Sequence, residues 1–213
     1  MDVLIAGLLA YLLGSISFSY VITKKVKKID IRQHGSGNAG ATNTLRVLGK
    51  GPAIVVLALD SLKGVIAVWF GFWSESMFMG TGLALFEGYP GWAPAISGLL
   101  AIFGHNWPIY YRFRGGKGVA TTAGVIGALI FFPAIYIGIV AILTVAITRF
   151  VSLGSLIFAI TTPFLVLLTL DHYGHPWPYF YLACVVGGMS LWRHRTNIKR
   201  LIQGNESKLG QKD

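Results

Sequence analysis

The chain has 213 residues, of which 54% are hydrophobic and 12% are charged, and its 18 Lys and Arg against 8 Asp and Glu give a formal net charge of +10 at pH 7. The charged share is about half of the ~25% found in soluble domains, which leaves too few charges to coat a water-soluble fold. Long apolar runs exclude disordered and fibrous classes, and the single Cys184 excludes an intramolecular disulfide and a thiol metal cluster. The composition predicts an all-α integral membrane protein.

Six apolar runs are candidates for crossing a membrane, because about 20 apolar residues span a hydrocarbon layer of about 30 Å. They cover residues 3–23, 52–73, 93–111, 119–148, 151–170 and 177–192. The first run lacks the basic start of a signal peptide and is followed at once by Lys24 and Lys25. We therefore interpret it as a permanent span.

The fourth run determines the topology. With Pro133 near its centre, it fits either one long tilted helix or two short helices broken at Phe132-Pro133. Two helices give seven spans and place every basic residue except Lys63 on one side, as expected if Lys and Arg remain cytoplasmic. We predict seven transmembrane helices in a single domain over residues 1–213, with the N-terminus outside and a polar cytoplasmic tail over about 193–213.

A glycine-rich stretch lies in the loop between the first two spans. It reads GSGNAGATN over residues 35–43, and Arg46 follows about one helical turn later. Glycines allow backbone amides to point one way and form a concave anion site, to which Ser, Asn and Thr add donors. One interpretation is a phosphate-binding loop supported by Arg46. The alternative is a flexible loop that caps a helix at Ser36 or Thr42.

A second glycine-rich stretch, RGGKG over residues 114–118, directly precedes the fourth span. The free amides and positive dipole end of that helix favour an anion beside Lys117. No Ser or Thr follows the Lys, so a Walker loop and a nucleotide triphosphatase are unsupported. The alternative is an ordinary basic turn. Just upstream, His105 of GHNWP fits a packing role better than a catalytic one.

The polar stretch HRTNIKRLIQGNE follows the last span over residues 194–206. If the last helix continues, His194 and Asn197 share one face, while Arg193, Thr196 and Arg200 share the neighbouring one. Such residues could complete a site at the membrane surface. The alternative for the basic residues is a stripe that rests on anionic lipid headgroups.

Polar residues inside the spans leave two alternatives open. Asp60 and Lys63 lie three residues apart, so they form either a structural ion pair or part of a substrate site. Ser155 bonds either its own helix backbone or a ligand. Carboxylates on the basic side are too few for a magnesium site, and no catalytic Ser-His-acid set is evident, so no metal and no covalent acyl-enzyme are predicted.

The strings GSGNAGATN, GHNWP, RGGKGVAT and HRTNIKRLIQGNE occur in this order between short spans. Together they resemble the bacterial acyl-phosphate:glycerol-3-phosphate acyltransferase family, the PlsY family, over residues 11–206. The resemblance implies a seven-helix enzyme of the bacterial cell membrane whose active site faces the cytoplasm. It implies transfer of a fatty acyl group from acyl phosphate, not acyl-coenzyme A, to the 1-hydroxyl of glycerol 3-phosphate, which forms lysophosphatidic acid in phospholipid biosynthesis.

The resemblance also implies roles for individual residues and partners. The implied catalytic residues are Ser36, Asn38, Arg46, Lys117 and His194, and the implied substrate-binding residues are Gly35, Gly37, Gly40, Asn43, Gly115, Gly116, Ser155, Asn197 and Arg200. The first loop, Arg46 and Lys117 are expected on the donor phosphate, and Ser155, His194 and Asn197 on the acceptor. No cofactor and no nucleic acid are expected. Membrane lipid and an upstream acyl-phosphate synthase resembling PlsX are candidate partners.

We expect these residues to fold into a single pocket. His194 is then either the proton acceptor or a residue that orients glycerol 3-phosphate, whose own phosphate takes the proton. We favour the second. The rival classes are a transporter of anions or phosphate esters and a non-catalytic membrane assembly factor.

Overall fold

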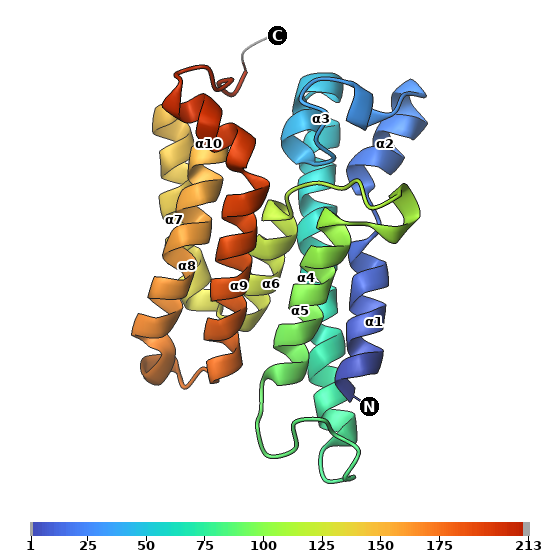
Figure 1. The fold of residues 1–213 in the computed structure, drawn as a ribbon, viewed down its shortest axis with the longest axis vertical. Coiled ribbons are helices and arrows are strands. Elements are labelled where there is room, and N and C mark those ends of the chain that lie inside the picture. Colours follow the sequence, from blue (N-terminus) through green and yellow to red (C-terminus); the bar gives the residue numbers. More distant parts are fainter. Residues whose placement is uncertain (1, 211–213) are drawn as a thin grey trace. The chain divides into compact units, whose positions relative to one another are not determined.

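The computed structural model describes residues 2–210, and over that range it is all-helical, without strands. Contacts divide the chain into two compact units, Met1–Leu129 and Ile130–Asp213 (Figure 1). That these units act as a single domain stays a prediction. The first unit contains α1 (Asp2–Gly14), α2 (Phe18–Lys27), η1 (Ile31–Gln33), α3 (Ala41–Leu48), α4 (Lys50–Phe78), α5 (Trp92–Asn106), η2 (Ile109–Tyr111) and α6 (Val119–Leu129). The second contains α7 (Phe131–Thr148), α8 (Val151–Tyr173), α9 (Trp177–Arg193) and α10 (Arg195–Ile202).

Small residues bring the helices of the first unit close together. α4 packs against α1, α5 and α6. Gly14 of α1 lies against the backbone of Ala101 in α5, and Gly124 of α6 lies against the backbone of Ser61 in α4. Ala67 of α4 is fully buried. Close backbone approach of this kind is typical of helices packed in lipid, where dispersion and interhelical hydrogen bonds replace the hydrophobic effect.

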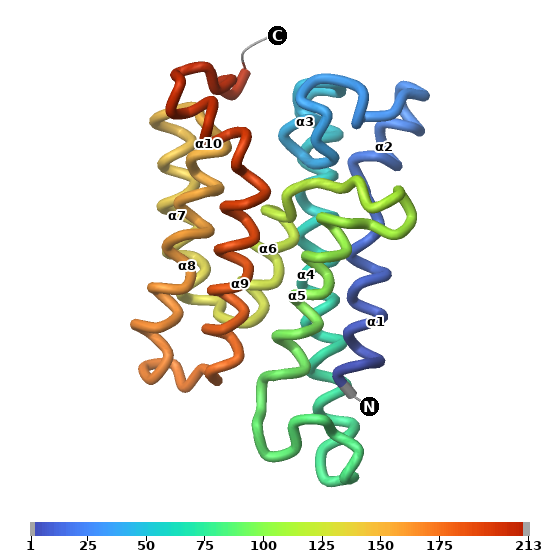
Figure 2. The backbone as a smooth tube through the Cα atoms, in the orientation of Figure 1, coloured from blue at the N-terminus to red at the C-terminus, as the bar shows by residue number. Residues whose placement is uncertain are grey.

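The first span is broken, which the sequence did not predict. α1 ends at Gly14 and the chain bends before it continues as α2 (Figure 2). The carbonyl of Ile16 in this break accepts a hydrogen bond from Lys63 Nζ at 2.8 Å. Lys63 also pairs with Asp60 at 2.8 Å, and each of the two side chains is 1% exposed. Lys63 therefore satisfies the Ile16 carbonyl, which would have a partner within the helix if the first span were unbroken.

The run over residues 119–148 forms two helices, α6 and α7, as predicted. The break falls at Ile130, so the predicted position at Phe132-Pro133 is wrong. Pro133 is the third residue of α7, where a backbone N–H has no partner within the helix. Proline is tolerated there because the group it lacks would otherwise be unsatisfied.

The second unit packs around α8, which contacts both α7 and α9. Gly154 of α8 faces the carbonyl of Ala141 in α7, and a Cβ placed on Gly187 of α9 would lie 3.0 Å from the carbonyl of Ala159 in α8. Both units therefore rely on small residues at their helix contacts.

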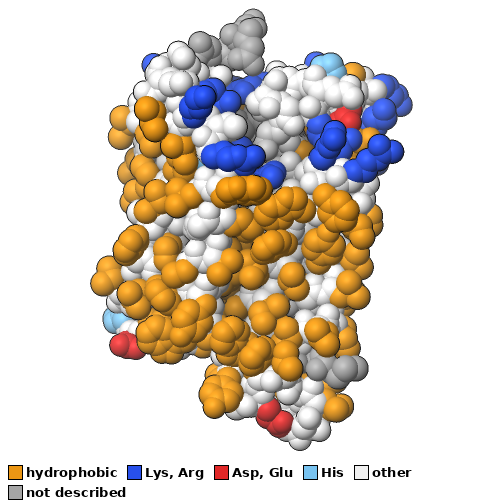
Figure 3. Space-filling model, viewed as in Figure 1, with side chains coloured by type: hydrophobic (Ala, Val, Ile, Leu, Met, Phe, Trp, Pro, Cys, Tyr) orange, Lys and Arg blue, Asp and Glu red, His pale blue; other side chains and the backbone are white. Residues whose placement is uncertain are grey.

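Four helices are long and apolar enough to cross a membrane among residues 2–210: Val3–Lys27 taken across its break, Lys50–Phe78, Phe131–Thr148 and Val151–Tyr173. Figure 3 shows Lys and Arg side chains gathered toward one end of each unit and hydrophobic side chains over most of the rest of this face. The remaining predicted spans correspond to α5, α6 and α9, which have 15, 11 and 17 residues. The seven-span topology and the outside N-terminus stay predictions.

Replacement of Gly124 by Ala is expected to destabilise the first unit, because the added methyl group would overlap the carbonyl of Ser61. Gly127 lies on the same helix with nothing within 4 Å of its Cβ position, so Gly127→Ala is the matched control. We expect Gly124→Ala to cost about 1–3 kcal/mol and to lower the Tm in detergent, while Gly127→Ala leaves the Tm unchanged or raises it. Equal Tm values for the two variants would contradict the close contact of α4 and α6.

Candidate functional site

Asn43 shapes the first glycine loop from inside. Its side-chain oxygen accepts a hydrogen bond from the backbone N–H of Ser36 at 2.9 Å. Its amide group donates to the carbonyls of Ile31 at 3.2 Å and His34 at 2.9 Å. The residue is 1% exposed. Asn43 thus holds the loop in one conformation, and its contact with substrate stays a prediction.

The backbone of this loop requires glycine at two positions. Gly35 and Gly37 have φ values of 57° and 69°, a region that other residues adopt only with strain. Between them Ser36 is exposed. α3 begins after Gly40 without a side-chain cap, so the alternative of a cap at Ser36 or Thr42 is wrong. Positive φ and an exposed hydroxyl fit the interpretation as an anion-binding loop.

Two further predicted residues accompany this loop. Asn38 is half-buried before Gly40, and Arg46 is half-buried in the last turn of α3. The end of α3 is held by Lys27, whose ammonium group donates to the carbonyl of Val47 at 2.7 Å. A cation at a helix C-terminus satisfies a carbonyl that has no partner within the helix.

Arg32 connects the first loop to the segment before the second. Its guanidinium group bonds the carboxylate of Asp30, with a shortest distance of 2.6 Å, and donates to the carbonyl of Tyr111 at 3.0 Å. It also lies over the ring of Tyr20, 5.1 Å from the centroid. The hydrogen bond from Arg32 holds the pKa of the Asp30 carboxyl below its ordinary value. The sequence did not predict this pair, for which the only signal was an acid two residues before a base.

Glycine is required at positions 115 and 116 by close packing. The N–H of Gly116 donates to the carbonyl of His105 at 3.1 Å, and a Cβ on Gly115 would overlap that carbonyl. A Cβ on Gly116 would overlap both the His105 ring and the carbonyl of Ala39 in the first loop. The two glycine loops therefore touch at Gly116. Lys117 follows directly and is half-buried.

Glu206 gathers the polar residues that follow α9. One carboxylate oxygen accepts from Asn197 at 2.6 Å and the other from Arg200 at 2.7 Å. Asn197 is buried and Arg200 is exposed. Burial alone would raise the pKa of the Glu206 carboxyl, but the nearby Ser152 hydroxyl and the hydrogen bonds from Arg200 and Asn197 hold this pKa below its ordinary value. The role of Glu206 was left open by the sequence. In the structure, Glu206 connects the tail to Asn197 and Arg200 of α10.

The last span was predicted to continue as one helix into the tail, but it is interrupted at His194. α9 ends just before it, and α10 begins just after it. The ring is buried, and its Nδ1 lies 2.8 Å from the carbonyl of Ser190. Because a carbonyl only accepts, Nδ1 carries the proton, and in the neutral ring Nε2 is the acceptor. Ser155, also buried, donates its hydroxyl proton to the carbonyl of Val151 at 2.9 Å, which was the alternative to ligand binding.

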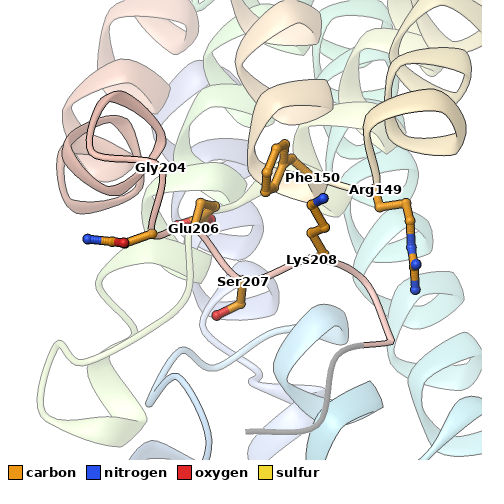
Figure 4. Close-up of a pocket in the computed structure, with 7 residues that line it drawn as sticks. Arg149, Phe150, Gly204, Glu206, Ser207 and Lys208 are labelled. Carbon is orange, nitrogen blue, oxygen red and sulfur yellow. The ribbon is translucent and has the colours of Figure 1, made fainter.

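An open pocket of about 640 Å³ lies in the second unit beside Glu206. It is lined by Arg149, Phe150 and residues 204–208, and Figure 4 shows Lys208 and Phe150 side by side at one wall. The tail folds back onto the turn between α7 and α8, where Arg149 and Leu209 exchange hydrogen bonds of 2.7 Å and 2.9 Å. Only the fold reveals this pocket, because its residues are about 60 positions apart in sequence.

The predicted site residues fall into two groups, one in each unit. Gly35, Ser36, Gly37, Asn38, Gly40, Asn43, Arg46, Gly115, Gly116 and Lys117 lie in the first, and Ser155, His194, Asn197 and Arg200 lie in the second. In the first unit the two loops meet, and in the second Glu206 joins Asn197 to Arg200. A single pocket for all of them stays a prediction. Among residues 2–210, no group of three or more His, Cys, Asp or Glu is arranged to hold a metal ion.

The chain is similar to known proteins over nearly its whole length. Residues 4–204 match the model of the family described as glycerol-3-phosphate acyltransferase. A glycerol-3-phosphate acyltransferase of Shouchella clausii is 57% identical over 205 residues, which cover 96% of this chain and 95% of the relative. One of Halalkalibacterium halodurans is 56% identical over 203 residues, which cover 95% of this chain and 93% of the relative.

Two crystal structures share the fold. PlsY, an integral membrane glycerol 3-phosphate acyltransferase, in its glycerol 3-phosphate form has a TM-score of 0.83 and 37% identity, with 99% of this chain and 96% of that chain covered. The lysophosphatidic acid form of PlsY has a TM-score of 0.81 and 36% identity at the same coverage.

The contribution of Glu206 to stability should depend on pH. A carboxyl whose pKa is lower in the folded than in the unfolded chain contributes fully above its unfolded pKa, and the contribution is lost as the pH falls through the folded pKa. We expect Glu206→Gln to lower the Tm in detergent at about pH 7, where a charged hydrogen bond contributes about 1.5–3 kcal/mol, and to have a smaller effect at about pH 3.5. Glu87→Gln, at an exposed position, is the control. An effect of Glu206→Gln that is equal at both pH values would refute the charged pairing.

Proposed function

This chain belongs to the glycerol-3-phosphate acyltransferase family, and we propose that it transfers a fatty acyl group from acyl phosphate to the 1-hydroxyl of glycerol 3-phosphate. The product is lysophosphatidic acid, an early intermediate of phospholipid biosynthesis. The observation that carries the proposal is the contact of two glycine loops at Gly116, beside Lys117, in a chain whose PlsY relative has been crystallised with glycerol 3-phosphate. We further propose the bacterial cell membrane as the location, with the reaction at the cytoplasmic face.

An acyl phosphate fits the chemistry of the first unit. This donor is a mixed anhydride, so its phosphate leaves readily once its negative charge is stabilised. The loop amides around Ser36, the half-buried Arg46 and Lys117, and the N-terminus of α6 supply positive potential for that charge. A donor activated in this way needs no coenzyme A and no cofactor, and an acyl-phosphate synthase resembling PlsX would supply it.

The hydrogen bonds of His194 do not favour Ser190 as a nucleophile. The hydroxyl of Ser190 lies 3.4 Å from Nδ1 of His194, but that nitrogen donates to the Ser190 carbonyl. It therefore has no lone pair with which to accept the hydroxyl proton. This geometry supports a direct transfer in which Ser190 forms no acyl-enzyme.

In the proposed step, the 1-hydroxyl oxygen of glycerol 3-phosphate attacks the acyl carbon. The new carbon–oxygen ester bond forms as the bond to the donor phosphate breaks, and the phosphate leaves with the electron pair. The hydroxyl proton passes to the phosphate of glycerol 3-phosphate. We assign Asn197, Arg200 and Ser155 to the acceptor, with Nε2 of His194 orienting its hydroxyl.

The transporter alternative loses its main support. It relied on charge deep in the membrane, and Asp60 and Lys63 pair with each other and satisfy the Ile16 carbonyl. A structural function accounts for both charges.

Purified protein in detergent should form lysophosphatidic acid from acyl phosphate and glycerol 3-phosphate, because the reaction needs no sealed compartment. We expect Arg46→Ala and Lys117→Ala each to lower kcat/KM by about 100-fold or more, as loss of a preorganised charge does, while the folded protein is still recovered. Lys50→Ala, at an exposed position, is the matched control and should retain wild-type turnover. Wild-type rates from Arg46→Ala and Lys117→Ala would refute these assignments, and an inactive wild type would refute the reaction.

The two roles considered for His194 give different results on substitution. The amide of Gln can replace a hydrogen-bonding nitrogen but cannot serve as a base near neutral pH. We expect His194→Gln to retain at least about a tenth of wild-type kcat and His194→Ala to lose about 100-fold. A loss of that size in both variants, with unchanged KM for glycerol 3-phosphate, would instead identify His194 as the proton acceptor.

A further inference from the structure

One edge of the His105 ring faces buried polar groups of two other helices. Its Nδ1 lies 3.3 Å from the hydroxyl oxygen of Thr121 on α6 and 3.6 Å from Oδ1 of Asp60 on α4. The same carboxylate oxygen pairs with Lys63. Thr121 is fully buried. The Nδ1 edge therefore faces a buried hydroxyl and a carboxylate that cannot move without disturbing a buried ion pair.

The opposite edge of the ring faces the second glycine loop. A Cβ on Gly116 would overlap Nε2 of His105, and the N–H of Gly116 donates to the His105 carbonyl at 3.1 Å. A Cβ on Gly115 would overlap this carbonyl as well. The ring and the backbone of His105 thus form the surface on which the turn before Lys117 rests. Ala39 of the first loop lies next to Gly116 as well.

We propose that His105 is a positioning residue of the acyl-transfer site, which sets the place of Lys117 by filling the space between the Asp60 carboxylate and Gly116. The inference rests on the proposed function, because it takes Lys117 to hold the donor phosphate. Lys117 is half-buried, so the position of its backbone limits the places that its ammonium group can occupy. A displacement of about 1 Å at such a group can cost as much as about 100-fold in rate.

A purely structural role for His105 predicts different kinetics. Loss of folded protein lowers the amount of active enzyme and leaves both KM values unchanged. Displacement of Lys117 weakens the hold on the donor phosphate and raises the KM for acyl phosphate, without affecting the KM for glycerol 3-phosphate. Asp60 and Lys63 are unsuitable test positions, because removal of one leaves the other charged and unpaired in the interior.

His105→Asn is the main test, because the Asn amide keeps a polar group near Thr121 and lacks the ring edge that contacts Gly116. We expect the KM for acyl phosphate to rise about tenfold, the KM for glycerol 3-phosphate to stay within about twofold, and the Tm in detergent to remain near that of the wild type. Thr121→Val should raise the KM for acyl phosphate, and Thr121→Ser, which keeps the hydroxyl, should not. His172→Ala, at an exposed histidine, is the control and should match the wild type.

An unchanged KM for acyl phosphate in His105→Asn would overturn the proposal. If His105→Asn does not yield folded protein, the Thr121 variants decide by the same criterion.

Hydrogen–deuterium exchange tests the same inference without turnover. The peptide that covers residues 112–119 should exchange faster in His105→Asn than in the wild type, while peptides from α4 stay unchanged. Equal exchange over residues 112–119 would overturn the inference even if the wild type is active. Faster exchange together with an inactive wild type would support the positioning contact and refute the proposed reaction.

Discussion

The carbonyl of Ile16, in the break of the first span, needs a hydrogen-bond donor from elsewhere in the first unit. In hydrocarbon each backbone polar group needs a partner within the protein, and the chain between α1 and α2 cannot supply one from its own helix. Lys63 meets this need for Ile16, and Asp60 neutralises the lysine. The hydroxyl of Ser15 in the same break accepts from the N–H of Ile109 at 3.4 Å, so the break also contacts the segment that leads to the second glycine loop.

The two glycine loops use glycine for different physical reasons. Gly35 and Gly37 adopt positive φ, which turns the backbone around the exposed Ser36. Gly115 and Gly116 are small so that the turn can lie directly on His105. Side-chain hydrogen bonds of Asn43 hold the first loop, and the second loop packs against His105 in the last turn of α5. Both loops thus have contacts within the protein that need no ligand, and fixed donors of this kind suit electrostatic catalysis.

In the second unit, a single carboxylate organises a polar surface. Glu206 joins Asn197 to Arg200 across a turn, and its charge is stabilised although it is largely buried. The break at His194 separates α10 from α9, and Nδ1 of His194 lies 2.8 Å from the carbonyl of Ser190. The tail is then fastened to the turn that carries Arg149. The contacts of Glu206 and Leu209 link residues that a straight helix would hold apart.

Composition and hydrophobic runs by themselves determined the membrane class, the helical content and the approximate position of most helices, because these depend on local chain chemistry. The four strings likewise sufficed to indicate the family. Tertiary structure decided the break at residues 15–17, the partners of Asp60 and Lys63, and the contact of His105 with Gly116. These features depend on which backbone groups meet across helices far apart in the sequence. A pattern read along one chain carries no signal for such contacts, since it records spacing along a helix but not the neighbour against which that helix packs.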